Sequence, residues 1–231
     1  MSEVLAVIPA YNEAARIGRV IEQARAFVRV LVVDDGSKDN TAAVAEAAGV
    51  EVLRQTPNQG KGTALRTGFR WGLEQGCDAV ITLDADGQHD PQEIPAFLAA
   101  YRARRPDLLI GARQYRAMPP VRRASNTIGR WMLNWALGQP VADNQSGYRL
   151  LSRRMMEAVL ESREDGFEFE VEMIATCLLN GYRLDWVPIR TIYAGEGSHI
   201  QPLRHVVHFF RVTWQTRLRM RAGRRAPATQ P

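Results

Sequence analysis

The chain has 231 residues, which at about 150 residues per domain allows one large domain or two small ones. Apolar residues make up 45% and charged residues 24%, the balance of an ordinary globular protein. This composition excludes a disordered chain, a collagen-like repeat and a disulfide-dense miniprotein. Cys77 and Cys177 lack the CxxC spacing of a zinc site, so we expect two reduced thiols in the core.

Nothing in the sequence predicts export or a membrane span. The N-terminus carries Glu3 and lacks the basic segment that opens a signal peptide. No apolar run reaches the roughly 18 residues that a membrane-spanning helix needs. We therefore expect a cytoplasmic protein.

Positive charge is concentrated at the C-terminal end. The net charge is +5, and after Glu196 the chain has seven arginines and no acidic residue. Taking seven positive charges from +5 leaves −2, so the rest of the chain is mildly acidic. A basic end of this kind favours a polyanion or an anionic membrane surface as partner. The alternative is a solvated tail that aids solubility.

Short apolar runs alternate with helical patterns through the first half of the chain. The spacing predicts strands at 3–9, 29–34, 50–54, 79–84 and 107–111, and helices at 12–27, 41–48, 60–74 and 91–104. The alternation predicts an α/β fold with a mostly parallel sheet and helices on both faces. Ligands bind such sheets beyond the carboxyl ends of the strands. Polar clusters follow three predicted strands, at 9–13, 34–37 and 84–89.

The second half is less regular, although no repeat or linker divides the chain. Strands are expected at 148–151 and 184–189, a helix at 167–179, and disorder at 222–231. Three acids of that helix do not share one face, so we expect them to be solvated or capping residues: Glu168, Glu170 and Glu172. Residues 115–140 combine a Pro-Pro step with a basic cluster and an apolar stripe, namely Arg122, Arg123 and Arg130, then Ile128, Trp131, Met132 and Trp135.

Asp84 and Asp86 are the most informative pair of residues. Two carboxylates two residues apart, in an extended exit from a strand, point the same way. Such a pair of negative charges is costly at a buried edge unless a cation neutralises it. Oxygen ligands select hard cations, which predicts Mg²⁺ or Mn²⁺. The alternative is that both aspartates cap the helix that begins near Pro91.

Two glycine-rich phosphate-binding motifs are absent. No GxGxxG follows the first predicted strand, and Gly60-Lys61-Gly62 lacks the spacing of a P-loop. A phosphate-bearing ligand would therefore be held by a metal and by basic side chains.

Six short motifs, in order along residues 3–200, resemble those of family 2 glycosyltransferases. They are Val7–Glu13 (VIPAYNE), Val32–Ser37 (VVDDGS), Asn58–Gly62 (NQGKG), Asp84–His89 (DADGQH), Gly111–Arg113 (GAR) and Asp143–Arg149 (DNQSGYR). The branch that they resemble contains dolichyl-phosphate mannose synthases and bacterial polyprenyl-phosphate glycosyltransferases. The resemblance implies a GT-A fold, a Rossmann-like domain for nucleotide-diphospho-sugars, over residues 1–200.

The resemblance also implies how a nucleotide-diphospho-sugar would bind. Pro9, Tyr11 and Glu13 would line the pocket for the base and ribose, and Asp35 would contact the base or ribose. The sugar nucleotide would further contact Lys61, Asp84, Ala85 and Asp86, while Asp84, Asp86 and Gln88 would hold the metal. The alternative for Tyr11 and Glu13 is packing and capping at a helix N-terminus.

Three residues are implied in catalysis: Asp143, Asp86 and Arg113. Asp86 would act through the metal, and Arg113 would reach the phosphates or the acceptor. Asp143 resembles the family's proposed general base, which a hydroxyl acceptor needs. A phosphate acceptor is already anionic, and Asp143 would then orient the acceptor or a nearby arginine. The alternative is a turn residue before the strand at Tyr148.

Two departures from the family pattern concern the end of the domain. Tyr193 and His199 stand where mannose synthases usually carry arginine and lysine. His199 would then ligate the metal or donate to a phosphate, although a lone histidine is more often structural. Transmembrane helices that follow the domain in many lipid-linked relatives are absent from this sequence.

The leading interpretation is an inverting glycosyltransferase that moves a sugar from a nucleotide-diphospho-sugar to a polyprenyl phosphate at the cytoplasmic membrane face. A soluble glycosyltransferase with a hydroxyl acceptor is the alternative. A nucleotide-binding module without transferase activity is a third possibility, and the Asp84, Asp86 and Gln88 set argues against it.

Residues 201–221 are expected to form a basic amphipathic helix. Its apolar positions recur at helical spacing: Leu203, Val206, Val207, Phe210, Trp214 and Leu218. Arginines cluster at its far end, so the pattern predicts a helix at the membrane interface, with an anionic membrane rather than a nucleic acid as partner. The apolar stripe at 128–135 would form a second membrane-facing surface. The alternative is a helix docked on the protein's own core.

Overall fold

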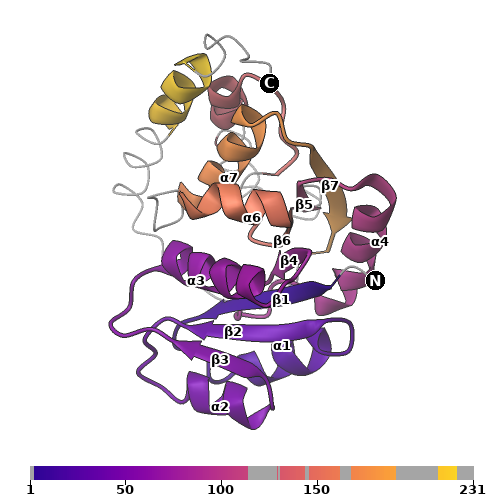
Figure 1. The fold of residues 1–231 in the computed structure, drawn as a ribbon. Helices are drawn as coiled ribbons and strands as arrows, with labels where there is room; N and C mark the ends of the chain where they lie inside the picture. Colours follow the sequence, from indigo (N-terminus) through magenta and orange to yellow (C-terminus); the bar gives the residue numbers. More distant parts are fainter. Residues whose placement is uncertain are drawn as a thin grey trace.

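The computed structural model describes residues 3–113, 129, 131–143, 146–161, 168–190 and 213–222 (Figure 1). The strands are β1 (Val4–Ala10), β2 (Arg29–Asp34), β3 (Glu51–Arg54), β4 (Ala79–Thr82), β5 (Leu108–Arg113), β6 (Arg149–Ser152) and β7 (Leu184–Ile189). The helices are α1 (Ile17–Ala24), α2 (Thr41–Ala47), α3 (Lys61–Glu74), α4 (Ile94–Arg104), α6 (Arg153–Leu160) and α7 (Glu168–Leu179), with a 3-10 turn η1 (Pro91–Glu93) before α4. Residues 131–137 and 213–222 are also helical.

All seven predicted strands are present, and they form one sheet in the order β3-β2-β1-β4-β6-β5-β7. β1 pairs in parallel with β2 and β4, β2 with β3, and β5 with β7. β6 is antiparallel to both of its neighbours, β4 and β5. The predicted α/β fold with a mostly parallel sheet is therefore confirmed.

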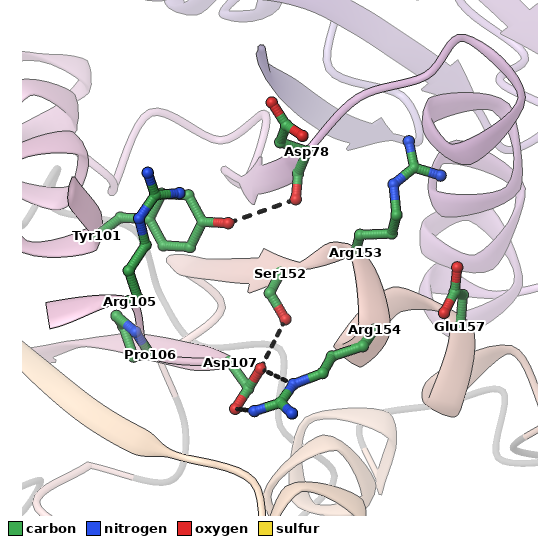
Figure 2. Close-up of a pocket in the computed structure, with 9 residues that line it drawn as sticks. All are labelled: Asp78, Tyr101, Arg105, Pro106, Asp107, Ser152, Arg153, Arg154 and Glu157. Atoms are coloured by element: carbon green, nitrogen blue, oxygen red, sulfur yellow. Dashed lines mark hydrogen bonds and ion pairs between the residues drawn. The ribbon is translucent and has the colours of Figure 1, made fainter. Parts of the chain in front are cut away.

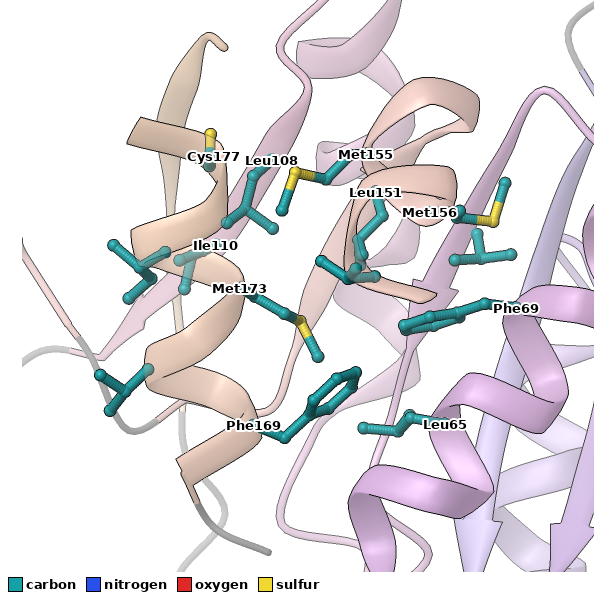
Figure 3. Close-up of a cluster of buried hydrophobic side chains, with 14 of the residues drawn as sticks. Leu65, Phe69, Leu108, Ile110, Leu151, Met155, Met156, Phe169, Met173 and Cys177 are labelled. Atoms are coloured by element: carbon teal, nitrogen blue, oxygen red, sulfur yellow. The ribbon is translucent and has the colours of Figure 1, made fainter. Parts of the chain in front are cut away.

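Alternation along β1 produces two cores, one on each face of the sheet. Leu5 and Val7 belong to the core that α3, α6 and α7 cover. Ala6 and Ile8 belong to the core beneath α1 and α4. Figure 3 shows side chains of α3, α6 and α7 meeting over the strands in the first of these cores. The expected helical cover on both faces is therefore confirmed.

The helix predicted at 12–27 is shorter than expected, because its first turns form a loop. Asn12 has a left-handed φ of 57°, which asparagine tolerates better than most residues. Its side-chain oxygen accepts a hydrogen bond from the Lys38 N–H at 2.8 Å, and its own N–H donates to Ser37 Oγ at 2.9 Å. The Glu13 N–H donates to Thr41 Oγ1 at 2.7 Å. These bonds tie the exit of β1 to the exit of β2 and postpone the helix to Ile17.

The helix at 213–222 packs on the rest of the domain through its smaller and more polar side. Thr213, Thr216 and Met220 are buried, and Met220 belongs to the same core as α7. Arg219 forms an ion pair with Glu172 of α7, with N–O distances of 2.5 and 2.9 Å. The preceding residues 201–212 and the tail 223–231 lie outside the described residues.

Cys77 and Cys177 are free and buried, as expected for core thiols. Burial raises the pKa of Cys177 to about 12, which keeps the thiol protonated and unreactive. Within the described ranges, no helix has the length and apolar character needed to cross a membrane.

Candidate active site

Three polar loops meet at the carboxyl ends of the parallel strands, because β1 lies between β2 and β4. The Asp35 N–H, just after β2, donates to the Ala10 carbonyl of β1 at 2.8 Å. The Leu83 N–H, just after β4, donates to the Val7 carbonyl at 3.2 Å. The polar clusters predicted to follow these strands therefore lie at one edge of the sheet, which we call the carboxylate edge.

Asp35 is buried and fixes the loop that leads into α3. Its two carboxylate oxygens accept hydrogen bonds from the Gln59 and Gly60 N–H groups, both at 2.8 Å. Gly60 has a φ of 91°, a conformation that favours glycine. The loop therefore delivers Lys61, the first residue of α3, to the carboxylate edge. The implied contact of Asp35 with the nucleotide stays a prediction.

Lys61 bridges two carboxylates that come from different parts of the chain. Its Nζ lies 2.6 Å from Asp84 Oδ1 and 3.0 Å from Glu170 Oε1. Burial alone would raise the pKa of Asp84, but the Lys61 ammonium outweighs it and holds that pKa at about 2. The same two carboxylates raise the pKa of Lys61 against the effect of its own burial. The Asp84 carboxylate and the Lys61 ammonium are therefore both ionised at neutral pH.

The turn after β4 is held by its own polar groups. The Asp84 N–H donates to His89 Nδ1 at 3.0 Å, and the Gln88 N–H donates to Asp86 Oδ1 at 2.9 Å. Burial lowers the pKa of His89, which leaves a neutral ring able to accept that bond. Asp90 accepts from the Gln92 N–H and caps the following turn. The alternative that Asp84 and Asp86 cap this helix is therefore wrong.

Arg113, at the end of β5, is clamped by Asp143. Its Nε and Nη2 lie 2.6 and 2.9 Å from the two carboxylate oxygens, and its backbone N–H lies 3.2 Å from Oδ2. The Asp143 side chain is fully buried, whereas 19% of the Arg113 side chain remains exposed. A bidentate pair of this kind fixes both position and orientation of the guanidinium. The structure thus joins two residues that the sequence could only associate through separate motifs.

The residues from Ser146 to Arg149 border the site on its buried side. Arg149 is completely buried, and it donates to the Ser146 carbonyl at 2.8 Å and to the Glu170 carbonyl at 2.5 Å. Burial lowers the pKa of Arg149 to about 10, against the attraction of nearby carboxylates. A Cβ at Gly147 would lie 2.9 Å from Lys61 Nζ and 3.0 Å from Asp84 Oδ2. A side chain at position 147 would therefore press on the bridged pair, and Lys61 or Asp84 would have to shift.

Sequence reasoning missed the part played by α7. Glu170 and Glu172 were expected to be solvated or capping acids, and this expectation is wrong, since both are buried and ion-paired. The signal available was their position in a strongly apolar segment, where a carboxylate needs a partner. For Glu168 only the backbone is described.

The remaining site residues lie around the same edge. Pro9 and Ala85 are buried, and the Glu13 carboxylate pairs with Arg16 at 2.9 Å. Tyr11 is 43% exposed, so a large part of its side chain faces solvent at this edge. No side chain caps α1, which contradicts the capping alternative for Glu13. Tyr193 and His199 lie outside the described residues, so their implied roles stay predictions.

The donor atoms of the turn after β4 suit a hard divalent cation. Asp84, Asp86 and Gln88 all offer oxygen, the ligand that Mg²⁺ and Mn²⁺ prefer. Within the part of the chain that the structure describes, no three His, Cys, Asp or Glu side chains are grouped to hold a metal by themselves. The set fits a cation that completes its shell with phosphate oxygens, as Mg²⁺ commonly does.

A second polar hollow lies at the opposite edge of the sheet, where β4 and β5 begin (Figure 2). There Asp107 accepts hydrogen bonds from Arg154 and from Ser152 Oγ, the latter at 3.0 Å. The Tyr101 hydroxyl donates to the Asp78 carbonyl at 3.4 Å. These polar groups bond to the protein itself, so they connect β5, β6 and α6 rather than form a second carboxylate edge.

A mostly parallel seven-stranded sheet with one antiparallel strand, and an acidic turn at its carboxyl edge, defines an enzyme of the GT-A glycosyltransferase class. The crystal structure of glucosyl-3-phosphoglycerate synthase from Mycobacterium tuberculosis, in complex with Mn²⁺ and UDP-glucose, shares this fold. It is similar with a TM-score of 0.72 and 20% sequence identity, over 95% of this chain and 79% of that chain.

The chain belongs to glycosyl transferase family 2, whose family model matches residues 5–160. It is 36% identical over 206 residues to the undecaprenyl-phosphate mannosyltransferase of Micrococcus luteus. The aligned region covers 80% of this chain and 82% of the relative. It is 35% identical over 206 residues to the polyprenol monophosphomannose synthase of Mycolicibacterium smegmatis. Here the aligned region covers 80% of this chain and 76% of the relative. The family resemblance predicted from the six motifs is confirmed.

Proposed function

We propose that this glycosyltransferase transfers a sugar, with inversion, from a nucleotide-diphospho-sugar to a polyprenyl phosphate at a membrane surface. The two relatives named for undecaprenyl phosphate and polyprenol support this acceptor class over most of the chain. The observation that carries the proposal is a surface of exposed tryptophans and a leucine, with an arginine stacked on it, on two helices of the second half of the chain.

This surface, which we call the tryptophan patch, consists of Trp131, Trp135, Trp214 and Leu218. Their exposed fractions are 71, 43, 59 and 51%, and the one other large hydrophobic side chain exposed in the described ranges is Tyr11. The Trp135 and Trp214 rings stack with centroids 6.0 Å apart, which joins the helix at 131–137 to the helix at 213–222. Exposed apolar side chains gathered in this way mark a surface for a membrane or a partner.

Basic residues accompany the tryptophan patch and favour an anionic membrane. The Arg217 guanidinium lies 5.2 Å from the Trp135 ring centroid and donates to the Trp135 carbonyl at 3.0 Å. Arg221, one turn further along the helix, is exposed. Tryptophan with arginine suits the interface between headgroups and acyl chains. The protein would therefore work as a peripheral enzyme on the inner face of the cell membrane, where a lipid phosphate is within reach.

At the carboxylate edge, Asp84, Asp86 and Gln88 would hold Mg²⁺ or Mn²⁺ together with the donor diphosphate. The bound cation would supply Lewis-acid stabilisation of the charge that develops on the leaving diphosphate. Lys61 would add positive charge beside the same phosphates. Pro9, Tyr11, Glu13, Asp35 and Ala85 would surround the nucleotide.

Arg113 is suited to bind the acceptor phosphate, because Asp143 fixes its guanidinium while part of the side chain stays exposed. A phosphate oxygen is already anionic and attacks the anomeric carbon without a general base. Asp143 then serves as a positioning residue, since Arg113 occupies both of its carboxylate oxygens.

A transfer assay tests the proposal. Purified protein is incubated with a panel of GDP- and UDP-sugars, a short-chain polyprenyl phosphate and Mg²⁺ or Mn²⁺, and labelled sugar is measured in the organic phase. We expect transfer from one donor, abolished by chelation. Transfer only to a soluble hydroxyl acceptor would favour the soluble alternative, and full activity in excess chelator would exclude the metal.

A further inference from the structure

The Lys61 bridge places an ammonium on the carboxylate that a metal would need. Lys61 comes from the start of α3, Asp84 from the turn after β4 and Glu170 from α7, so three separate elements build the contact. At 2.6 Å, Lys61 Nζ is in direct hydrogen-bond contact with Asp84 Oδ1. A divalent cation on the same carboxylate would face this positive charge at close range, and the two would repel each other.

Glu170 offers the ammonium a second anion. Its side chain is almost completely buried, Oε1 binds Lys61, and Oε2 is buried without a hydrogen-bond partner. A buried carboxylate oxygen left unpaired costs free energy, so the group gains from any cation that moves closer. The spare oxygen is therefore available to Lys61 if Asp84 is taken by another cation.

Lys61 is partly exposed, with 36% of its side chain accessible, and a second loop runs beside it. Gly147 passes so close that an added Cβ would lie 2.9 Å from Nζ. The backbone that leads into Lys61 is fixed, because Asp35 accepts hydrogen bonds from the Gln59 and Gly60 N–H groups. Because the start of the helix keeps its place, both carboxylates stay within reach of the ammonium.

We propose that Lys61 is a resident counter-cation of Asp84, that a divalent metal displaces it toward Glu170, and that this exchange sets the affinity for the metal. The proposal rests on the metal at Asp84 and Asp86 under the proposed function and adds a regulating pair to it. Without a metal, Lys61 neutralises Asp84 and so stabilises the site. An incoming metal has to displace the ammonium, so Lys61 lowers the affinity for the metal. Glu170 is a positioning residue that acts on the metal through Lys61.

Binding of Mn²⁺ alone, followed by electron paramagnetic resonance, tests this exchange without any turnover. Lys61→Met removes the competitor, so Mn²⁺ should bind about tenfold more tightly, the scale of groups that surround a metal shell. Glu170→Gln leaves the ammonium with Asp84 as its one full anion, so Mn²⁺ should bind several-fold more weakly. Arg66→Met is the matched control, since it removes one positive charge from α3 beside Phe169 instead of Asp84 and should change the affinity less than twofold.

The double variant separates the exchange from a general effect of charge. Without Lys61, Glu170→Gln should change Mn²⁺ affinity less than twofold, because the residue through which it acts is gone. An equal loss of affinity in both backgrounds would overturn the proposal, as would unchanged or weaker binding in Lys61→Met. The double variant also removes the buried charge that Lys61→Met leaves unpaired, so it serves if the single variant does not fold.

Wild-type protein distinguishes this proposal from the proposed function. If it binds no Mn²⁺ even with a saturating nucleoside diphosphate, the metal site itself is wrong and both proposals fail. If it binds Mn²⁺ but Lys61→Met binds no more tightly, only the exchange is wrong.

Discussion

At the carboxylate edge, Lys61, Asp84 and Glu170 are bonded to one another, and of the three only Glu170 is almost fully withdrawn from solvent, whereas the tryptophan patch leaves large apolar side chains in water. The first region consists of charges that are fixed before any ligand arrives. The second consists of surface that is unfavourable in water and gains only when something covers it. The charges of the first region are therefore paired within the free protein and, under our proposals, change partners when a metal binds, whereas the second region has to gain a partner from outside the chain.

The largest effect is expected at the carboxylate edge. Asp86→Ala removes one fixed carboxylate from the proposed metal and diphosphate site, and kcat should fall by about a hundredfold or more. Steady-state assays with the preferred sugar nucleotide measure this change.

Asp90→Asn is the matched control for Asp86→Ala, because it removes a carboxylate four residues away and keeps an oxygen for the cap on Gln92. Its kcat should stay within about twofold of wild type. Comparable losses in both variants would mean that the turn is only structural and that the carboxylate edge does not carry the chemistry.

The carboxylate edge was also the region that the sequence predicted best. Three of its polar clusters directly follow apolar strands, and parallel strands bring their carboxyl ends together whatever else the fold does. Asp84 and Asp86 could thus be placed at this edge by local pattern, whereas Lys61 was assigned to the same site only through the family resemblance. The contact of Lys61 with Glu170 could not, because 109 positions separate them and only packing of α7 on α3 brings them together.

The face of the helix at 213–222 was harder to predict for a physical reason. The spacing of Trp214 and Leu218 indicated an apolar stripe, which a core and a membrane both require. In the structure Thr213, Thr216 and Met220 face the core, and Trp214 and Leu218 face solvent. From hydrophobicity alone, the side with Trp214 and Leu218 would be expected to dock on the core. The ion pair of Arg219 with Glu172 and the stacking of Trp214 on Trp135 accompany the observed side.

Two substitutions on this helix compare its faces directly. Met220→Ala opens a cavity in the core and should lower the free energy of unfolding by about 2 kcal/mol or more. Leu218→Ala removes an exposed side chain and should change it by less than about 0.5 kcal/mol. Urea denaturation followed by circular dichroism measures both. The reverse order of effects would mean that the helix docks through its tryptophan side and that the tryptophan patch is not a free surface.

Vesicle binding tests what the tryptophan patch is for. The double variant Trp131→Ser with Trp214→Ser should bind vesicles of mixed anionic and neutral lipid at least about tenfold more weakly, because two exposed indoles lose their burial in the interface. Sedimentation with liposomes measures the bound fraction, and wild-type binding should weaken as salt rises.

Tyr11→Ser provides the control for vesicle binding, since it removes the exposed aromatic ring at the carboxylate edge and should leave binding unchanged. If the wild type itself stays in the supernatant at low salt, the membrane interpretation fails. A soluble acceptor then becomes the better hypothesis.

The smallest expected effect on transfer lies at Asp143, which holds Arg113 at the end of β5. Asp143→Asn leaves Arg113 in place but removes the bidentate ion pair that orients it, a loss of about 1.5 kcal/mol for charge-assisted hydrogen bonds. If Arg113 binds an acceptor phosphate, the KM for acceptor should rise about tenfold, while kcat and the KM for donor change less than about threefold. A general base would behave differently, with a kcat loss of roughly 10²–10⁴-fold and a changed pH profile.

Arg113→Met should raise the same KM for acceptor, and adding Asp143→Asn to it should have little further effect, because Asp143 acts through the arginine. Additive losses in the double variant would show instead that Asp143 contacts the reacting groups on its own.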